Sequence, residues 1–254
     1  MVPFLAALSN RLWGNTPTLG RFNVKRIAII GAGPSGLAAA KYLLAEDAFN
    51  KIDIFEQRCN VGGVWNYTVE AVPRTDPHEP LARPLWRDSD GEKQPVFVSP
   101  MYNTLETNIP HPLMQFSDLQ FPKDTQLFPR REVVLGYLEK YAEEVRHLIR
   151  FSTQVMSIDL QMDKPHPKWL VRTQNLLTTA IEESTYDAVV VASGHYNVPY
   201  IPDIPGAQAW DCKYPGTMIH SKFYRSPDNF KDKVAIPASL EWWDDLTRSR
   251  KLSW

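Results

Sequence analysis

Three glycines in the run Gly31-Ala32-Gly33-Pro34-Ser35-Gly36 have the G-x-G-x-x-G spacing of a phosphate-binding loop. In such a loop Gly31 would make a tight turn, Gly33 would let the backbone approach a pyrophosphate, and Gly36 would let a helix pack closely on a strand. The helix that begins at Pro34 and Ser35 would offer N–H groups and a positive dipole end to the phosphates. Glu56 follows 25 residues after Gly31, where an acid that accepts hydrogen bonds from a ribose is expected.

The elements that must position this loop are present on both sides of it. Val24 to Ile30 (VKRIAII) is short, rich in β-branched residues and followed by glycine, which predicts a buried strand. Residues 34–45 predict a helix and Ile52 to Phe55 a second strand, which completes a β–α–β unit of about 30 residues. The expected fold class is therefore α/β, a Rossmann-type dinucleotide-binding domain with a parallel sheet.

The rest of the chain alternates between patterned and irregular stretches. Residues 70–100 are rich in proline and charge and predict a long surface excursion. Residues 131–147 carry apolar side chains at helical spacing and predict a helix. Strands are expected at 149–158, 169–173 and 186–193.

Composition narrows the function classes. The net charge is −1 with mixed signs, so we expect no nucleic-acid partner and no anionic membrane partner. Cys59 and Cys212 are far apart, which excludes a C-x-x-C dithiol centre and suits a reducing compartment. No run reaches the roughly 18 apolar residues of a membrane span, and Met1 to Leu8 lack the flanks of a signal peptide. A cytoplasmic protein is expected.

Further motifs resemble one family. Gly62-Gly63-Val64-Trp65, which follows Glu56-Gln57-Arg58, resembles the G-G-x-W stretch of class B flavoprotein monooxygenases. Leu105 to Pro110 (LETNIP) looks like the L-x-T-N-x-P segment of that family, and Ala192 to Tyr196 (ASGHY) like its A-S-G-H turn. The run from Tyr214 to Tyr224 is similar to the F-x-G-x-x-x-H-x-x-x-F/Y fingerprint, with Tyr214 for the first Phe and His220 as its histidine. Over residues 24–236 the chain resembles flavin-containing monooxygenases, in particular their yeast-type, thiol-oxidising branch.

The resemblance implies a chemistry. In that family NADPH reduces FAD, the reduced flavin binds molecular oxygen, and the resulting flavin hydroperoxide oxygenates a soft nucleophile, the nitrogen or sulfur atom of a small molecule. It also implies site residues. Gly63, Val64 and Trp65 would lie along the flavin, Gln57 beside the ribose acceptor Glu56, and Val155 against the adenine through its backbone. Thr107 and Asn108 would complete the cofactor site.

Asn108 is the catalytic candidate, because its amide donates and accepts hydrogen bonds without a proton to lose. Outside the T-N-x-P context, an asparagine before Ile-Pro would be read as a turn residue. His195 and His220 are interpreted as structural histidines, and neither has metal-ligand spacing. No metal is expected.

The chain departs from the family at its C-terminal end. Lys231 to Ile236 begin the strand that should precede an NADPH-binding glycine motif, but residues 237–254 contain no glycine. Three parts are expected. They are an extension (1–24), an FAD-binding domain (25–230, with the proline-rich insertion 70–100), and the start of an NADPH domain (231–254) that diverges after Ile236. A frame change, a mis-spliced exon or a natural short paralogue would each account for this divergence.

The fold is thus expected to be incomplete relative to the family's two dinucleotide domains, with the NADPH site largely absent. Two functions stay open at this point. One is an FAD- and NADPH-dependent monooxygenase, and the other is a catalytically incomplete FAD-binding fragment or short paralogue. An amine oxidase or a dithiol reductase is a weaker third candidate, because the first lacks the fingerprint and the second needs C-x-x-C. The oligomeric state is not indicated.

Overall fold

The computed structural model describes residues 24–69, 84–89, 92–162, 166–195, 199–200 and 202–232. The expected N-terminal extension, Tyr196 and the divergent segment after Asp232 lie outside the described residues.

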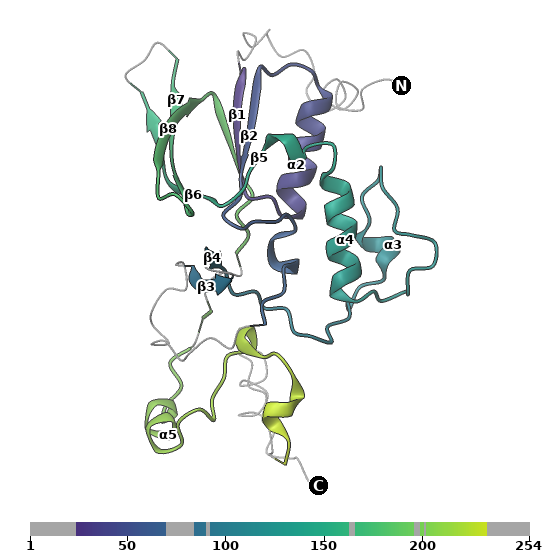
Figure 1. Ribbon diagram of the computed structural model, residues 1–254, viewed down its shortest axis with the longest axis vertical. Coiled ribbons are helices and arrows are strands. Elements are labelled where there is room, and N and C mark those ends of the chain that lie inside the picture. The colour runs from purple at the N-terminus through teal and green to yellow at the C-terminus, as the bar shows by residue number, and fades with distance from the viewer. Residues whose placement is uncertain are drawn as a thin grey trace, which may run out of the picture.

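A parallel sheet forms the centre of the molecule (Figure 1). β1 (Arg26–Ile30) lies between β2 (Lys51–Phe55) and β9 (Ala188–Val191), and β5 (Ile149–Arg150) pairs with the far side of β2. All three pairings are parallel, with Ile29 opposite Ile54 on one side and Val190 on the other. This sheet, with the helix between β1 and β2, confirms the predicted α/β fold of Rossmann type.

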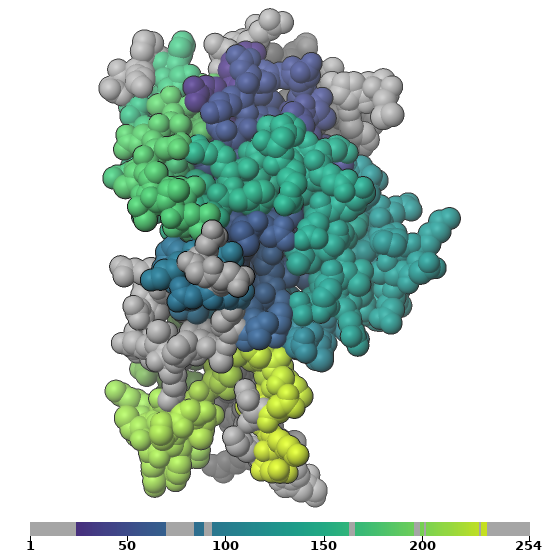
Figure 2. All heavy atoms as spheres, in the orientation of Figure 1, coloured from purple at the N-terminus to yellow at the C-terminus, as the bar shows by residue number. Residues whose placement is uncertain are grey.

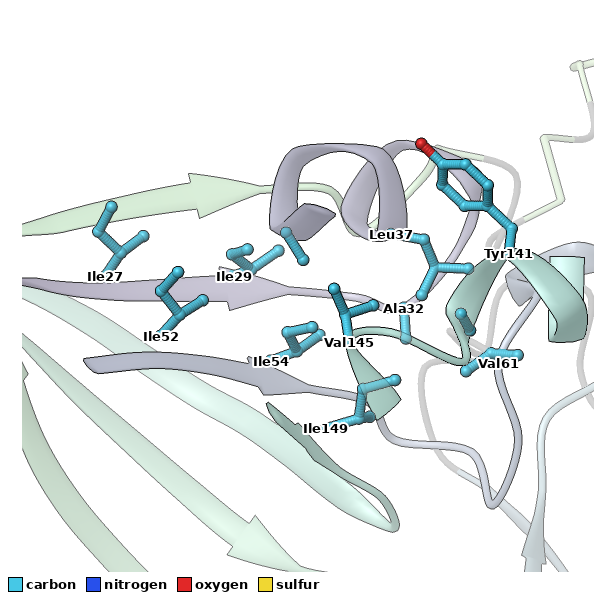
Figure 3. Packing of buried hydrophobic residues seen from close by; sticks show 12 residues of the cluster. Ile27, Ile29, Ala32, Leu37, Ile52, Ile54, Val61, Tyr141, Val145 and Ile149 are labelled. Atoms are coloured by element: carbon cyan, nitrogen blue, oxygen red, sulfur yellow. The ribbon is translucent and has the colours of Figure 1, made fainter. Parts of the chain in front are cut away.

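Two helices pack on one face of the sheet, α2 (Pro34–Ala45) and α4 (Arg131–Ala142). Between them and the strands lies the main apolar core (Figure 3). It is built from β-branched residues of the strands and from apolar side chains of the two helices and of the turn after α4. Its labelled members include Ile27, Ile29, Ile52, Ile54, Leu37 and Val145. A core of this kind requires β1 and β2 to be apolar, which is why both were recognisable from sequence.

A second, antiparallel sheet covers the other face. It is formed by β6 (Thr153–Gln161), β7 (Lys168–Asn175) and β8 (Ile181–Tyr186). Ala28 and Phe55 of the parallel sheet pack there against Val171 and Tyr186. The Tyr186 hydroxyl donates to a carboxylate oxygen of Asp53 at 2.5 Å, which ties the two sheets together.

The remaining elements are short. β3 (Leu85–Ser89) and β4 (Glu92–Val96) pair as an antiparallel hairpin, and α3 (His111–Met114) and α5 (Ala207–Lys213) are brief helices. Turns of 3₁₀ helix occur at η1 (Gly63–Trp65), η2 (Arg146–Leu148), η3 (Ser221–Phe223) and η4 (Pro227–Phe230). Figure 1 places α5 and the last turns at the end of the molecule away from the sheets. Within the described part of the chain, no helix is long and apolar enough to cross a membrane.

Several sequence expectations need correction. The helix expected over 131–147 ends at Ala142, and the strand expected over 149–158 is broken at Ser152, whose φ is 49°. The strand expected over 186–193 is shorter, and Tyr186 belongs instead to β8, which was not predicted. The described part of the proline-rich stretch is not all surface excursion, since residues 85–89 pair with 92–96 and Phe97 and Val98 are buried.

Candidate functional site

Two glycines of the first loop are required by the fold itself. Gly31 has a φ of 101°, and a Cβ built there would lie 2.5 Å from the carbonyl oxygen of Ala192. A Cβ on Gly36 would lie 1.9 Å from the carbonyl oxygen of Gly31, because α2 begins directly against the end of β1. Any side chain at either position would therefore collide with backbone that cannot move aside.

Gly33 is different, because no contact among the described residues requires a glycine there. Its φ of −77° and ψ of −177° suit any residue, and the nearest atom to an added Cβ is the Gly63 Cα at 3.8 Å. Gly33 is the N-cap of α2, and its carbonyl accepts from the Leu37 amide at 3.0 Å. Pro34 opens the helix and Ser35 is exposed. The space in front of Gly33 thus lies at a helix N-terminus, where an anionic ligand is stabilised.

A second glycine loop lies against the first. The Gly62 amide donates to the Ala32 carbonyl at 2.9 Å, and a Cβ on Gly63 would lie 3.3 Å from the Gly33 Cα. Gly62 and Gly63 both have positive φ, at 100° and 57°. The Asn66 side chain donates to the carbonyls of Val61 and Gly63 at 2.7 and 3.1 Å, which fixes the turn that carries Trp65.

Glu56 connects the loop to the end of β2. It is 4% exposed, and its two carboxylate oxygens accept from the amides of Ala32 and Arg58 at 2.8 and 2.9 Å. Burial raises the pKa of Glu56, while these backbone hydrogen bonds act in the opposite direction. Each oxygen retains a further lone pair, so the side chain can still accept from a ligand hydroxyl. Gln57 is half-buried beside it.

The segment that carries Thr107 and Asn108 is held in place by the N-terminus of α4. The Thr107 amide donates to Pro129 O at 3.0 Å, and the Arg131 amide donates to Leu105 O at 3.1 Å. The Thr107 hydroxyl donates to Ile109 O at 2.9 Å, which closes a tight turn around Asn108. Asn108 is exposed at the apex of this turn.

A pocket of about 390 Å³ brings several predicted residues together. Its walls include Trp65, Met101, Tyr102, Leu105, Thr107 and Asn108. Val155 is not among them, because it lies in β6 and packs beside Phe55 and Tyr186. The start of β6 is nevertheless adjacent to Glu56, since the Thr153 amide donates to Glu56 O at 2.9 Å. Val155 therefore lies toward the Glu56 end of the site and Asn108 at the pocket.

A group of cations near this site was missed by sequence reasoning. Arg58 and Lys222 are 8% and 5% exposed, and Arg225 is half-buried with them. Burial lowers the pKa of Arg58, against the attraction of Glu56. Burial, followed by the charges of Arg58 and Arg225, lowers the pKa of Lys222 to about 8. Charged residues are expected on the surface, so no local pattern predicts that these three are buried or half-buried. The one available signal was the position of Lys222 within the fingerprint run and of Arg225 directly after it.

His220 has a local structural role. Its Nδ1 accepts from the Lys222 amide at 3.1 Å and caps η3. Burial lowers the pKa of His220, opposed by its hydrogen bond to the backbone of Tyr200. His195 is exposed.

The parallel sheet, the helix that starts at Gly33, and the buried acid at the end of β2 define a dinucleotide-binding protein of the Rossmann type. Two family models match the chain. Residues 29–85 match an NAD(P)-binding Rossmann-like domain, and residues 82–240 match the family described as flavin-binding monooxygenase-like. The chain belongs to this flavin-binding monooxygenase-like family.

Named relatives agree with this assignment. A flavin-containing monooxygenase of Arabidopsis thaliana, FMO GS-OX5, is 35% identical over 230 residues, covering 87% of this chain and 45% of that protein. Among solved structures, the S-allyl-L-cysteine S-oxygenase from Allium sativum is 34% identical with a TM-score of 0.64, covering 81% of this chain and 44% of that one. Tmm from a Pelagibacter strain is 29% identical with a TM-score of 0.62, with 81% and 43% covered. The chain thus spans less than half the length of these relatives.

Membership confirms the predicted enzyme class, a flavoprotein oxidoreductase of the monooxygenase type, together with FAD and NADPH as the cofactors of that class. It also confirms that the fold is partial relative to its relatives. The roles predicted for individual residues, and the yeast-type branch, stay predictions.

Proposed function

We propose that this chain is the flavin-binding part of a monooxygenase that oxygenates nitrogen or sulfur atoms of small molecules, using FAD, NADPH and molecular oxygen. The observation that carries the proposal is Gly33. It is the one glycine of the first loop whose added Cβ meets no atom closer than 3.8 Å, so the space in front of it is open to a ligand. A pyrophosphate at the N-terminus of α2 accounts for a glycine at this position.

The described residues suit FAD along its whole length. The pyrophosphate would lie before Gly33, Pro34 and Ser35, and Glu56 would accept from the ribose with its remaining lone pairs. Gly63, Val64 and Trp65 lie next to Gly33, in the direction of the pocket. Gln57 and the backbone of Val155 would border the adenosine end. Bound flavin supplies the redox chemistry, so the protein need not supply a nucleophile.

Asn108 is proposed to act at the reacting atoms. Its amide donates and accepts hydrogen bonds and holds no titratable proton, so it orients a reacting oxygen without protonating it. The acidic residue beside it, Glu106, has its carboxylate 3.8 Å from Arg130. Met101 and Leu105 contribute apolar walls to the same space.

The substrate class rests on a related protein and on the pocket. The garlic relative is named for oxygenation of the sulfur of S-allyl-L-cysteine. A pocket with mostly apolar walls, in which Asn108 supplies a neutral amide and Glu106 a carboxylate, suits a soft nucleophile such as a thioether, a thiol or an amine.

We propose the domain boundaries predicted from sequence, with FAD bound by 25–230 and the start of the NADPH domain at 231. The second candidate, a chain that carries FAD without turnover, is favoured by one sequence feature: residues 237–254 contain no glycine with which to hold a second dinucleotide. Anaerobic addition of NADPH separates the two, because only the enzyme would bleach its bound FAD.

Replacing Gly33 with alanine tests the cofactor site. The added methyl group has room in the ligand-free fold but would occupy the space of the pyrophosphate. We therefore expect FAD to bind at least tenfold more weakly, about the effect of losing one charge-assisted hydrogen bond, with unchanged thermal stability. Gly136→Ala is the matched control, since a Cβ there meets nothing within 4 Å. FAD titration followed by flavin fluorescence measures the affinity. Equal affinity in Gly33→Ala and the parent would contradict the assignment.

Replacing Asn108 tests the reacting end. Bound FAD is reduced with dithionite, and the protein is then mixed with oxygen and an alkyl thioether for a single turnover. In Asn108→Ala and Asn108→Asp we expect the oxygenation step to slow by ~10²–10³ and hydrogen peroxide to replace sulfoxide, with the carboxylate worse because of its charge. Asn103→Ala, an exposed asparagine outside the pocket, is the control. A parental ratio of peroxide to sulfoxide in both variants would leave Asn108 a turn residue.

A further inference from the structure

Arg225 joins three segments that are far apart in sequence. One guanidinium nitrogen, Nη1, donates to the carbonyls of Tyr224, Lys222 and Met101 at 2.8, 2.9 and 3.3 Å. The other, Nη2, donates to the Thr68 hydroxyl at 3.3 Å. The planar guanidinium presents its donors in a fixed fork, so one side chain sets the relative positions of all these acceptors.

From Thr68 the hydrogen bonds continue to the second glycine loop. The Thr68 hydroxyl also accepts from the Ser99 amide at 3.2 Å, and the Ser99 hydroxyl donates to Val64 O. Ser99 is completely buried and Thr68 is 5% exposed, so both are shielded from competing water. A continuous path thus runs from Arg225 to the residue before Trp65, which forms one wall of the pocket.

A second path reaches another part of the pocket lining. The Met101 carbonyl accepts from Arg225, and the Asn103 amide donates to Arg225 O at 3.2 Å. The rings of Tyr102 and Tyr224 meet edge to face, with centroids 5.2 Å apart. Met101 and Tyr102 both line the pocket. Figure 2 shows the yellow segment after residue 220 lying directly against the blue part of the molecule that carries these loops.

The charge of Arg225 also acts on the neighbouring cations. Arg58 and Lys222 are cations in the same buried group, and Arg225 is one of the charges that lower the pKa of Lys222. The carbonyl and hydroxyl acceptors contribute to holding the guanidinium in this position.

We propose that Arg225 is a positioning residue that fixes the position of Trp65 relative to Met101 and Tyr102, and so couples residues 221–226, at the end of the fingerprint run, to the shape of the flavin pocket. The effect on flavin rests on the proposed function; the coupling of the segments does not.

Hydrogen exchange of the ligand-free 254-residue chain tests the coupling. In Arg225→Met we expect amides of 64–69 and 99–103 to exchange roughly tenfold faster, while those of β1 and β2 keep their rates, as expected for local loss of hydrogen bonds. Lys231→Met removes an exposed cation five residues after this segment and is the control. Faster exchange confined to 221–226 would overturn the proposal.

Thr68 provides a second variant that leaves Arg225 in place. Thr68→Val keeps the shape and removes the hydroxyl, so we expect faster exchange at 64–69 with little change at 221–226. Thr68→Ser restores the hydroxyl and should restore parental exchange. Equal exchange at 64–69 in the Val and Ser variants would overturn the relay through Thr68.

Flavin spectra give the readout specific to the pocket. In Arg225→Met, FAD should still bind within about threefold of the parent, because Gly33 and Glu56 are untouched, but its fluorescence should rise as Trp65 loses contact with the ring. Arg225→Lys should bring the flavin fluorescence only partly back to the parental value, because an ammonium group lacks the forked set of donors of a guanidinium. Unchanged fluorescence in Arg225→Met overturns the pocket role. If the parent itself binds no FAD, the proposed function fails, and the exchange measurements still decide the coupling.

Discussion

The two ends of the described chain are stabilised in different ways. Among the described residues, every buried hydrophobic side chain lies between residues 27 and 186, in the two sheets, the helices and the loops between them. In the described part of 199–232 the one buried residue is a lysine, Lys222, whereas Tyr200, Trp210 and Ile219 are each more than 45% exposed.

This difference shows which interactions stabilise each region. The sheet region is stabilised by burial of apolar surface, at about 25 cal/mol per Å². The later region contacts the earlier part of the chain through the hydrogen bonds of Arg225 to Met101 and Thr68, and its own last turns are held by the cap that His220 makes. In the later region the titration of Lys222 and His220 makes stability depend on pH, whereas the apolar core of the described residues contains no group that titrates in the same pH range.

The largest expected effect compares one residue type in the two regions. Ile29 is fully buried between β2 and α2, so Ile29→Ala removes packed methylene groups and should cost about 2–5 kcal/mol of unfolding free energy. Ile219 is 46% exposed, and Ile219→Ala should cost less than about 0.5 kcal/mol. Urea unfolding of both variants measures this. Similar losses would show that the later region also has an apolar core.

A smaller effect concerns the buried lysine. The pKa of Lys222 is lowered to about 8 by burial, then by Arg58 and Arg225, so between pH 8 and 10.5 the unfolded chain binds more protons than the folded protein. Folding therefore becomes more favourable as the pH rises through this window, by up to about 3 kcal/mol.

Lys222→Met should abolish this gain, because it removes the titrating group and keeps the stem. The measurement is the difference in unfolding free energy between parent and variant at pH 7.5 and pH 10.5. Tyrosines titrate alike in both proteins and cancel. A difference that does not change with pH would contradict the prediction.

The smallest effect is on the acid side and involves His220. Its pKa is lowered mainly by burial, so its contribution is fully present above pH 6.5 and is lost as the pH falls below that value. The reason is structural, because a protonated Nδ1 cannot accept from the Lys222 amide. His220→Asn keeps an acceptor for the cap and does not titrate.

We expect amides of 221–224 to lose protection between pH 7 and pH 5 in the parent and to keep it in His220→Asn, after correction for intrinsic exchange. The amides of β1 serve as an internal reference. Equal pH dependence in the two proteins would show that the cap is not held by His220.

Local pattern accounts for the parts of the fold that could be predicted. The strand ending at Ile30 and the helix from Pro34 to Ala45 were expected within two residues of their observed bounds, because glycine and proline mark their ends and apolar residues fill them. β8 was missed because its sequence, IEESTY, is polar and largely exposed. It is a strand because it pairs with β7, and such pairing leaves little trace in the strand's own sequence.

The candidate site likewise contains residues that the sequence predicts and residues that it does not. Spacing predicted the cofactor-binding residues Gly31, Gly33, Gly36 and Glu56. It does not show that, of the three glycines, only Gly33 has open space in front of it, because that space depends on Gly63 lying opposite. Arg58 and Lys222 were not predicted, since charged residues are rarely buried and no local pattern distinguishes those that are.

The sequence by itself determined the β–α–β unit, the glycine loop and the acid that follows it, because each depends on residues within about 30 positions of one another. Only the tertiary structure decided which glycine faces open space, that Trp65 and Asn108 share a pocket, and that Arg225 reaches Thr68, 157 positions away. Contacts of that separation are set by how the two sheets and the later segment pack, and no local propensity encodes them.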